Sequence, residues 1–183
     1  MDFSLTVDQE LLIESIQEFA ERYFDEDTVN AMYENHGIPD EIGEAYRDAG
    51  FAFMGLPEEC GGIPCDKLTL GLMTETLYHR TGCMTPFMTA MLATADVAEF
   101  GTPEQVSLVV DQYNKSGKPI ASPAPSEPGA GSYTKAMSTY TKRQDDATYN
   151  MNGQKTWATN VRTLPQLLVV SQADHPAQAH HTF

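Results

Sequence analysis

The sequence predicts an α+β protein in which a helical domain precedes a β domain. Apolar residues recur at helical spacing through residues 1–117, whereas the patterns after Gly117 are extended or alternating. The two kinds of pattern do not interleave, which argues against an alternating α/β sheet. We therefore expect an all-α domain at 1–117 and an incomplete antiparallel β domain at 118–183.

The helical domain is expected to hold six helices. The first begins at a capping box, Thr6-x-x-Gln9, and a stripe of residues behind it should face the core: Leu12, Ile13, Ile16, Phe19, Ala20 and Tyr23. Proline at a first turn and glycine after a last turn delimit several others. The remaining predicted ranges are 27–35, 39–49, 66–80, 85–100 and 102–115. A turn-rich connector is expected at 55–62.

The β domain is expected to contain extended segments at 119–125, 138–143, 149–159 and 167–171. Asp145-Asp146 marks an expected hairpin turn, and Asn152-Gly153 is a two-residue turn signal. Residues 174–183 carry no helix or strand pattern. Four extended segments are not enough to close a barrel.

Composition excludes several classes of function. An apolar content of 41% over 183 residues is enough for a packed core, and 11 basic against 26 acidic residues give a net charge of −15. Without a cluster of lysine and arginine, nucleic acid and anionic membranes are poor partners. No charged leader and no apolar run of membrane-spanning length occur, so we expect a cytoplasmic protein without a membrane span.

Cysteine and histidine spacing gives no metal site. The three cysteines, Cys60, Cys65 and Cys83, lack a CxxC spacing and indicate reduced thiols. The five histidines show no HExxH pattern: His36, His79, His175, His180 and His181.

Two coupled motifs in the β domain point to a ligand. The run Ser122–Ser132 has three prolines and two glycines, so it is a loop that can bring backbone amides to a ligand. Gly129 and Gly131 are expected to free its backbone for positive φ. The second run, Asn152–Thr159, sets Trp157 and Thr159 on one face if it is extended. A flat aromatic beside a hydroxyl suggests a planar heterocycle such as a flavin.

Glu127-Pro-Gly-Ala-Gly-Ser132 followed by Asn152-Gly-x-Lys-x-Trp-x-Thr-Asn160 resembles the central signature of the acyl-CoA dehydrogenase family. The resemblance implies FAD as cofactor and an acyl-CoA thioester as substrate. It places Ser126 at the pyrimidine edge of the flavin, Trp157 on the ring system and Thr159 near N5. Pro123 and Pro125 match positions of backbone contact with the flavin, and Ser132 matches a position that touches CoA.

Each of these site residues also has an ordinary structural interpretation. Ser126 and Ser132 fit simple turns, Trp157 fits core packing and Thr159 fits a strand. Four positions depart from the family pattern: Ser126 replaces threonine, Tyr133 replaces aspartate, Ala158 replaces a larger aliphatic residue, and Pro125 cannot donate a backbone hydrogen bond. These departures are expected to alter the flavin and CoA contacts.

The resemblance covers only the N-terminal part and the start of the middle domain of the family, most like members for short-chain or carnitine-type substrates. The family's C-terminal helical bundle and its catalytic glutamate have no counterpart, so no catalytic residue is assigned. The place of Glu127 in the motif indicates that it anchors the loop and does not abstract a proton.

The resemblance also implies partners and leaves alternatives. Electron-transferring flavoprotein is the expected electron acceptor, and a homo-oligomer or a partner subunit is the expected assembly. A related acyl-CoA oxidase or flavin monooxygenase remains an alternative, as does a non-catalytic remnant that acts as a binding or assembly subunit.

Overall fold

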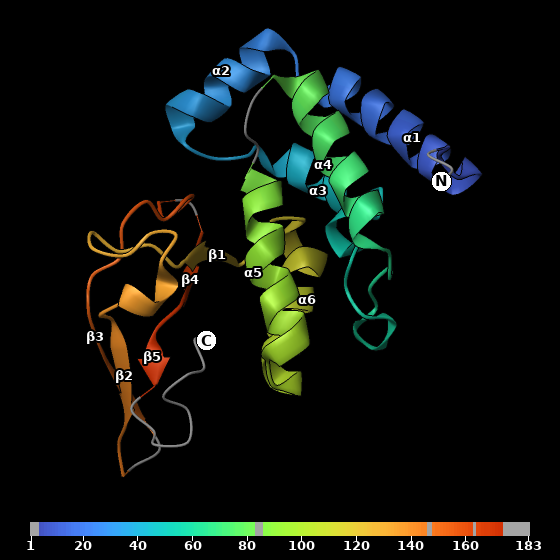
Figure 1. The fold of residues 1–183 in the computed structure, drawn as a ribbon. Coiled ribbons are helices and arrows are strands. Elements are labelled where there is room, and N and C mark those ends of the chain that lie inside the picture. The colour runs from blue at the N-terminus through green and yellow to red at the C-terminus, as the bar shows by residue number, and fades with distance from the viewer. Residues whose placement is uncertain (1–3, 83–85, 146–147, 163, 174–183) are drawn as a thin grey trace. The chain divides into compact units, whose positions relative to one another are not determined.

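A computed structural model describes residues 4–82, 86–145, 148–162 and 164–173. The chain divides into two compact units, Met1–Ile120 and Ala121–Phe183 (Figure 1). The first is called the helical unit and the second the β unit. All the α-helices among the described residues precede the strands, which confirms the expected α+β class.

The first three helices begin and end close to the predicted positions. They are α1 (Val7–Tyr23), α2 (Glu26–Asn35) and α3 (Asp40–Asp48). Thr6 and Gln9 form the predicted capping box, in which each side chain bonds the backbone N–H of the other. Asp25 caps α2 by accepting a hydrogen bond from the Thr28 amide. Such caps satisfy amides that the helix leaves free. Because the capping residue lies directly before the first turn, local sequence can reveal it.

The other three helices also begin close to the predicted positions. They are α4 (Lys67–Thr81), α5 (Pro86–Phe100) and α6 (Pro103–Ser116). Asp66 caps α4, and a second capping box joins Thr102 to Gln105 at the start of α6. Between α3 and α4 the chain forms two short 3-10 turns, Phe51–Phe53 and Glu58–Cys60, in and before the expected 55–62 connector.

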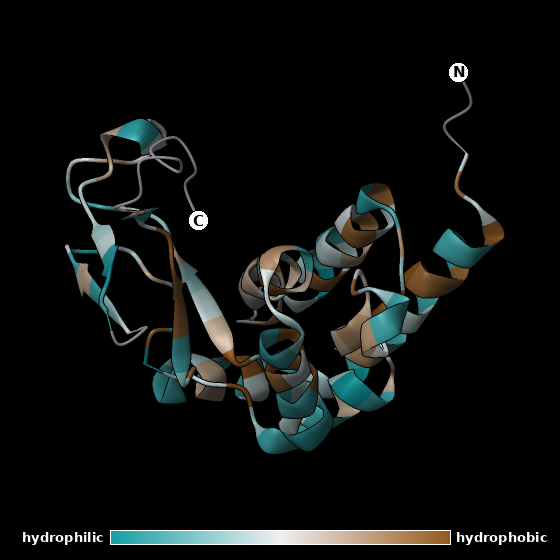
Figure 2. Cartoon of the chain, turned by 90° about the horizontal axis from the view of Figure 1, so that it is seen from below, coloured by the Kyte–Doolittle hydropathy of each residue, from teal (hydrophilic) through white to brown (hydrophobic). Residues whose placement is uncertain are grey.

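The core of the helical unit is an aromatic cluster. Phe19 of α1, Tyr46 of α3, Phe51 and Phe87 of α5 are all buried, and the Tyr46 and Phe87 rings stack with centroids 3.9 Å apart. Helices α1 and α4 lie side by side (Figure 1). Apolar and polar residues alternate around the helices (Figure 2), as expected for elements that bury one face. The predicted α1 stripe is confirmed at Ile16, Phe19 and Ala20, which are buried.

The β unit contains short strands in two sheets. Strand β1 (Ala121–Ala124) pairs with β4 (Gln166–Val169), and β2 (Tyr140–Arg143) lies between β3 (Tyr149–Asn152) and β5 (Gln172–Ala173). The β2–β3 pair is antiparallel, as predicted, whereas β1–β4 and β2–β5 are parallel. The antiparallel pairing expected for the β domain is therefore found in β2–β3 and not in the other two described pairs. The parallel pairs join strands separated by long connections, which hairpin signals do not reveal.

The predicted extended segment 149–159 is too long. Strand β3 ends at Asn152, and residues 153–158 follow without regular structure before a turn begins at Thr159. Asn152-Gly153 is not a hairpin turn between paired strands, because the next strand, β4, pairs with β1. A β carbon at Gly153 would lie 2.6 Å from the Thr139 α carbon, so this glycine permits a close backbone approach. Close approach, and not turn geometry, explains the glycine.

Some predictions fall outside the described residues. The second residue of the predicted Asp145-Asp146 turn lies there, as do Cys83 and the segment 174–183 with its three histidines. Within the described ranges no helix is long and apolar enough to cross a membrane. The same ranges contain no cluster of histidine, cysteine and carboxylate side chains suited to a metal ion.

Candidate functional site

The two sequence motifs meet in the β unit. The Thr156 amide donates to the Ser126 carbonyl at 2.9 Å, and Lys155 Nζ donates to the Pro125 carbonyl at 2.9 Å. At the other end of the contact, the Ser122 hydroxyl donates to the Thr159 carbonyl. The loop and the segment that follows β3 are therefore joined directly, although about thirty residues separate them in sequence.

Glu127 is the centre of this junction. Its carboxylate accepts hydrogen bonds from the Ser138 amide at 2.6 Å, the Ser138 hydroxyl at 2.7 Å and the Thr139 amide at 2.9 Å. Lys155 Nζ lies 2.9 Å from the same carboxylate, and the two side chains are 10% and 2% exposed. The anchoring role that the motif indicated for Glu127 agrees with these contacts.

The environment of Glu127 favours its ionised form. Burial by itself acts to raise the pKa of the carboxyl group, but hydrogen bonds from Thr139, Ser138 and Lys155 stabilise the carboxylate and outweigh burial. The pKa of Glu127 therefore lies well below its ordinary value of 4.5. A carboxylate held in this way is a poor proton acceptor at neutral pH.

This low pKa predicts that the β unit loses stability in acid. The ionised carboxylate contributes its full stabilisation above about pH 4.5, where the unfolded chain is also ionised, and progressively less as the pH falls toward the folded pKa. Calorimetric unfolding between pH 7 and pH 3 measures the effect. Glu127→Gln, as the control, should show a shallower decline with acid. Equal declines in the two proteins would contradict the assignment.

The residues predicted to contact the flavin from the loop lie in and just after β1. Pro123 is half-buried in β1 opposite Leu168, and Pro125 is exposed with its carbonyl bonded to Lys155. Ser126 is half-buried, and its carbonyl is taken by the Thr156 amide. Among the described residues, Ser126 thus contacts the second segment through its backbone, and its hydroxyl makes no hydrogen bond.

Trp157 is the most unusual residue of the second segment. Its side chain is 92% exposed, and its backbone has φ 60°, the left-handed region that bulky residues avoid. This conformation replaces the extended one on which the shared face of Trp157 and Thr159 depended. The interpretation of Trp157 as core packing is wrong, because the ring is not buried. A large exposed aromatic in a strained backbone conformation is a candidate binding surface.

The CoA-side residues lie beyond a tight turn. Glu127 and Ala130 exchange two backbone hydrogen bonds of 2.9 and 3.2 Å around Pro128-Gly129, and Ser132 and Tyr133 follow, both exposed. Neither Gly129 nor Gly131 has positive φ, so the expected reason for these glycines is wrong. A β carbon at either position would meet nothing within 4 Å. Their backbone is simply left uncovered.

The sequence motif contained Lys155 and Thr156, but their contribution was not recognised. Lys155 is one of the residues that define the motif, but the motif does not indicate what it contacts. Only the fold places its ammonium group against Pro125 and Glu127. The Thr139 hydroxyl and the Thr156 hydroxyl are both buried and make no hydrogen bond among the described residues. No local sequence signal distinguishes these threonines from ordinary strand residues.

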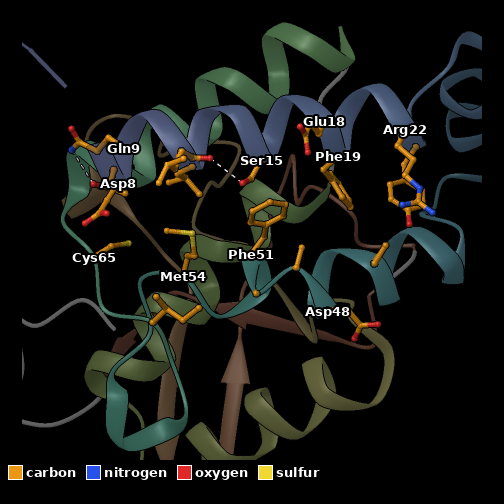
Figure 3. A pocket seen from close by; sticks show the side chains of 18 of the residues that line it. Asp8, Gln9, Ser15, Glu18, Phe19, Arg22, Asp48, Phe51, Met54 and Cys65 are labelled. Atoms are coloured by element: carbon orange, nitrogen blue, oxygen red, sulfur yellow. Dashed lines mark hydrogen bonds between the residues drawn. The ribbon is translucent and has the colours of Figure 1, made fainter. Parts of the chain in front are cut away.

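The helical unit has a separate open cleft of about 1220 Å³. It lies along α1 and α3, with Phe19, Phe51 and Met54 toward its interior and Glu18 and Asp48 at its edges (Figure 3). One arginine, Arg22, lies among the lining residues, together with six acidic ones: Asp8, Glu18, Glu41, Glu44, Asp48 and Asp66. The cleft is therefore apolar inside and acidic at its rim.

Comparisons with known proteins agree with the motifs. Residues 6–112 match the family described as "Acyl-CoA dehydrogenase, N-terminal domain". The chain is 34% identical to the probable acyl-CoA dehydrogenase YdiO of Escherichia coli K12, with 100% of this chain and 47% of that protein covered. The chain thus spans about half the length of the curated relatives it matches.

Solved structures share the fold. A structure reported for the electron transferring flavoprotein of Acidaminococcus fermentans has a TM-score of 0.76 and 26% identity, covering 100% of this chain and 48% of that one. A glutaryl-CoA dehydrogenase from Mycobacterium smegmatis, in complex with FADH2, has a TM-score of 0.78 and 22% identity over 93% and 44% of the chains. The family match covers residues 6–112, more than half of the chain. This polypeptide therefore belongs to the acyl-CoA dehydrogenase family, of which it spans an N-terminal portion.

Proposed function

We propose that this chain is the FAD-binding N-terminal portion of an acyl-CoA dehydrogenase that desaturates an acyl-CoA thioester. The observation that carries the proposal is the direct junction of the two motifs through Ser126, Thr156 and Lys155. Family membership supports the reaction class, and the FADH2 complex of the M. smegmatis relative supports the cofactor. The finer assignments below rest on the residues of this chain.

The β unit offers groups that fit a flavin. Trp157 presents an exposed ring for stacking, and Ser126 and Thr159 supply hydroxyls on the two joined segments. In the proposed complex Ser126 binds the pyrimidine edge, Thr159 lies near N5, and Pro123 and Pro125 contact the ring through their backbone. When bound, FAD would accept a hydride from the β carbon of the acyl chain. The chain's own residues would orient the ring and exclude water from it.

The distribution of charge supports binding of anionic ligands by the β unit. The helical unit carries 22 acidic and 6 basic residues, whereas residues 121–183 carry 4 acidic and 5 basic residues. FAD and CoA are both anionic, so the nearly neutral β unit repels them far less than the overall charge of −15 suggests. Ser132 remains the proposed CoA contact, and Tyr133 beside it adds no negative charge.

We propose that this chain does not supply the catalytic base. Of the described residues, Glu127 is the carboxylate that belongs to the motif, and its low pKa and four hydrogen bonds suit an anchor. Proton abstraction next to a thioester needs a base whose pKa lies closer to the working pH. Reduction of a dye by the purified chain with an acyl-CoA would contradict this assignment.

Electron-transferring flavoprotein is the proposed acceptor of the complete enzyme, and a homo-oligomer or a partner subunit is the proposed assembly. Support for a covered surface comes from strands β2 and β3, where Tyr140, Tyr149 and Met151 are exposed. This exposure also favours the second candidate, a non-catalytic binding or assembly subunit. The two differ in one property, since only the first requires the chain to bind FAD. An oxidase or a flavin monooxygenase of the same scaffold would share that property.

We expect FAD to quench the emission of Trp157 with one-to-one stoichiometry. Trp157 is the single tryptophan of the chain, so its emission reports on the proposed site without interference. Trp157→Ala should weaken FAD binding about tenfold, because stacking on an aromatic ring contributes roughly 1–3 kcal/mol. Equilibrium dialysis of FAD measures the affinity of both proteins.

Tyr140→Ala is the matched control, because it removes another exposed aromatic ring from the β unit. It should leave FAD affinity unchanged. A wild-type protein that neither binds FAD nor shows quenching would favour the assembly subunit over the flavoprotein.

A further inference from the structure

We propose that Lys155 is a positioning residue that locks the two halves of the flavin site together and thereby sets the affinity for FAD. The inference rests on the proposed function and adds a residue and a physical mechanism to it. Lys155 would not touch the flavin through its ammonium group in this mechanism. It acts through the loop and segment that it joins.

The first step of the argument is the position of the Lys155 ammonium group. It bonds the Pro125 carbonyl and the Glu127 carboxylate, both at 2.9 Å, and its side chain is only 10% exposed. A lysine that bridges two acceptors on one loop fixes both the distance and the orientation of that loop. The residue that follows it, Thr156, bonds Ser126 between the same two acceptors.

The second step is what these contacts hold in place. Residues 125, 126 and 127 each make one contact with the pair 155–156, so three successive loop residues are matched to two successive segment residues. Of the groups proposed to contact the flavin, Ser126 is one of these residues and Trp157 directly follows Thr156. Loss of the ammonium group would leave the Glu127 carboxylate buried without its cation and would free the Pro125 carbonyl.

The third step is that Lys155 is the cation that pairs with Glu127 among the described residues. In the same ranges, the other donors to Glu127 are Ser138 and Thr139, which are neutral and lie on the segment before β2. Neither of them donates to Pro125 or to Ser126, the loop residues that the pair 155–156 contacts. Within the described part of the chain, Lys155 therefore supplies the charged contact between the two segments, beside the neutral hydrogen bonds from Thr156 to Ser126 and from Ser122 to Thr159.

The test uses Lys155→Met and Lys155→Arg in the full chain. Amide hydrogen exchange reports on the junction without any flavin: in Lys155→Met the Thr156 and Thr139 amides should exchange at least about tenfold faster, while the β2–β3 amides stay protected. FAD affinity, measured by dialysis, should fall at least about tenfold. Lys155→Arg retains a buried cation with several donors and should restore most of both properties.

Lys135→Met is the matched control, because Lys135 is an exposed lysine of the same unit and should change neither property. If Lys155→Met fails to fold by circular dichroism, Lys155→Met combined with Glu127→Gln removes the unpaired buried charge and is measured in its place. Unchanged exchange at Thr156, or unchanged FAD affinity in a wild type that binds FAD, would overturn the inference. If the wild type binds no FAD, the proposed function fails, and the inference that Lys155 sets FAD affinity falls with it; the exchange data then show separately whether Lys155 still locks the junction.

Discussion

Gly117→Ala is expected to destabilise the helical unit by about 2–5 kcal/mol. A β carbon at this position would lie 1.6 Å from the Gly43 carbonyl oxygen and 2.1 Å from the Gly43 carbonyl carbon. Gly117 also ends α6 with φ 62°, a left-handed conformation that costs other residues about 1–2 kcal/mol. Overpacking against a rigid backbone adds about 1–3 kcal/mol. Denaturant unfolding followed by far-ultraviolet circular dichroism measures the loss.

Gly71→Ala is the matched control for Gly117→Ala. Gly71 lies inside α4, and a β carbon there would meet nothing within 4 Å. Alanine is the better helix former, so this variant should gain about 0.5–1 kcal/mol. The two substitutions are chemically identical and are expected to have opposite signs. A Gly117→Ala protein as stable as the wild type would show that α3 and α6 do not approach at these glycines.

Gly153→Ala is expected to destabilise the β unit by about 2–3 kcal/mol. The added carbon would lie 2.3 Å from the Thr139 hydroxyl and 2.6 Å from its α carbon, so the Thr139 backbone must move. Since the Thr139 amide donates to Glu127, the movement should also disturb the junction of the two motifs. Hydrogen exchange of the Thr139 and Ser138 amides measures both effects at once.

Gly129→Ala provides the corresponding control in the loop. Its added carbon would meet nothing within 4 Å, and its φ is not positive, so the fold should tolerate the change. If Gly129→Ala weakens FAD binding while it leaves stability unchanged, the uncovered backbone serves the ligand. Equal exchange rates in Gly153→Ala and the wild type would contradict the close approach to Thr139.

The helices were predictable because their signals are local. Thr6 with Gln9, Asp66 and Thr102 with Pro103 lie within one turn of the helix starts that they specify, and the observed starts agree within one or two residues. The β segments were less predictable. The ladder positions of β4 and β5 depend on partners 45 and 32 residues earlier in the chain, which no short window contains.

The candidate site was likewise predictable only in part. Its motifs identified the family from residues that lie in two short runs, and Glu127 was correctly interpreted as an anchor. The conformation of Trp157 was not predictable, because a left-handed tryptophan contradicts its own backbone preference and requires the fold to impose it. Gly129 and Gly131 were misjudged for a related reason, since glycine permits positive φ without requiring it.

The family, the order of helices before strands, and the two motifs that come together at the site could all be inferred from the sequence. Each of these depends on interactions between residues close in the chain or on spacing within a motif. Tertiary structure alone decided that Lys155 joins Pro125 to Glu127 and that Gly117 meets Gly43. These contacts connect residues 28 to 74 positions apart, and their energy comes from burial and close packing, which no local pattern records.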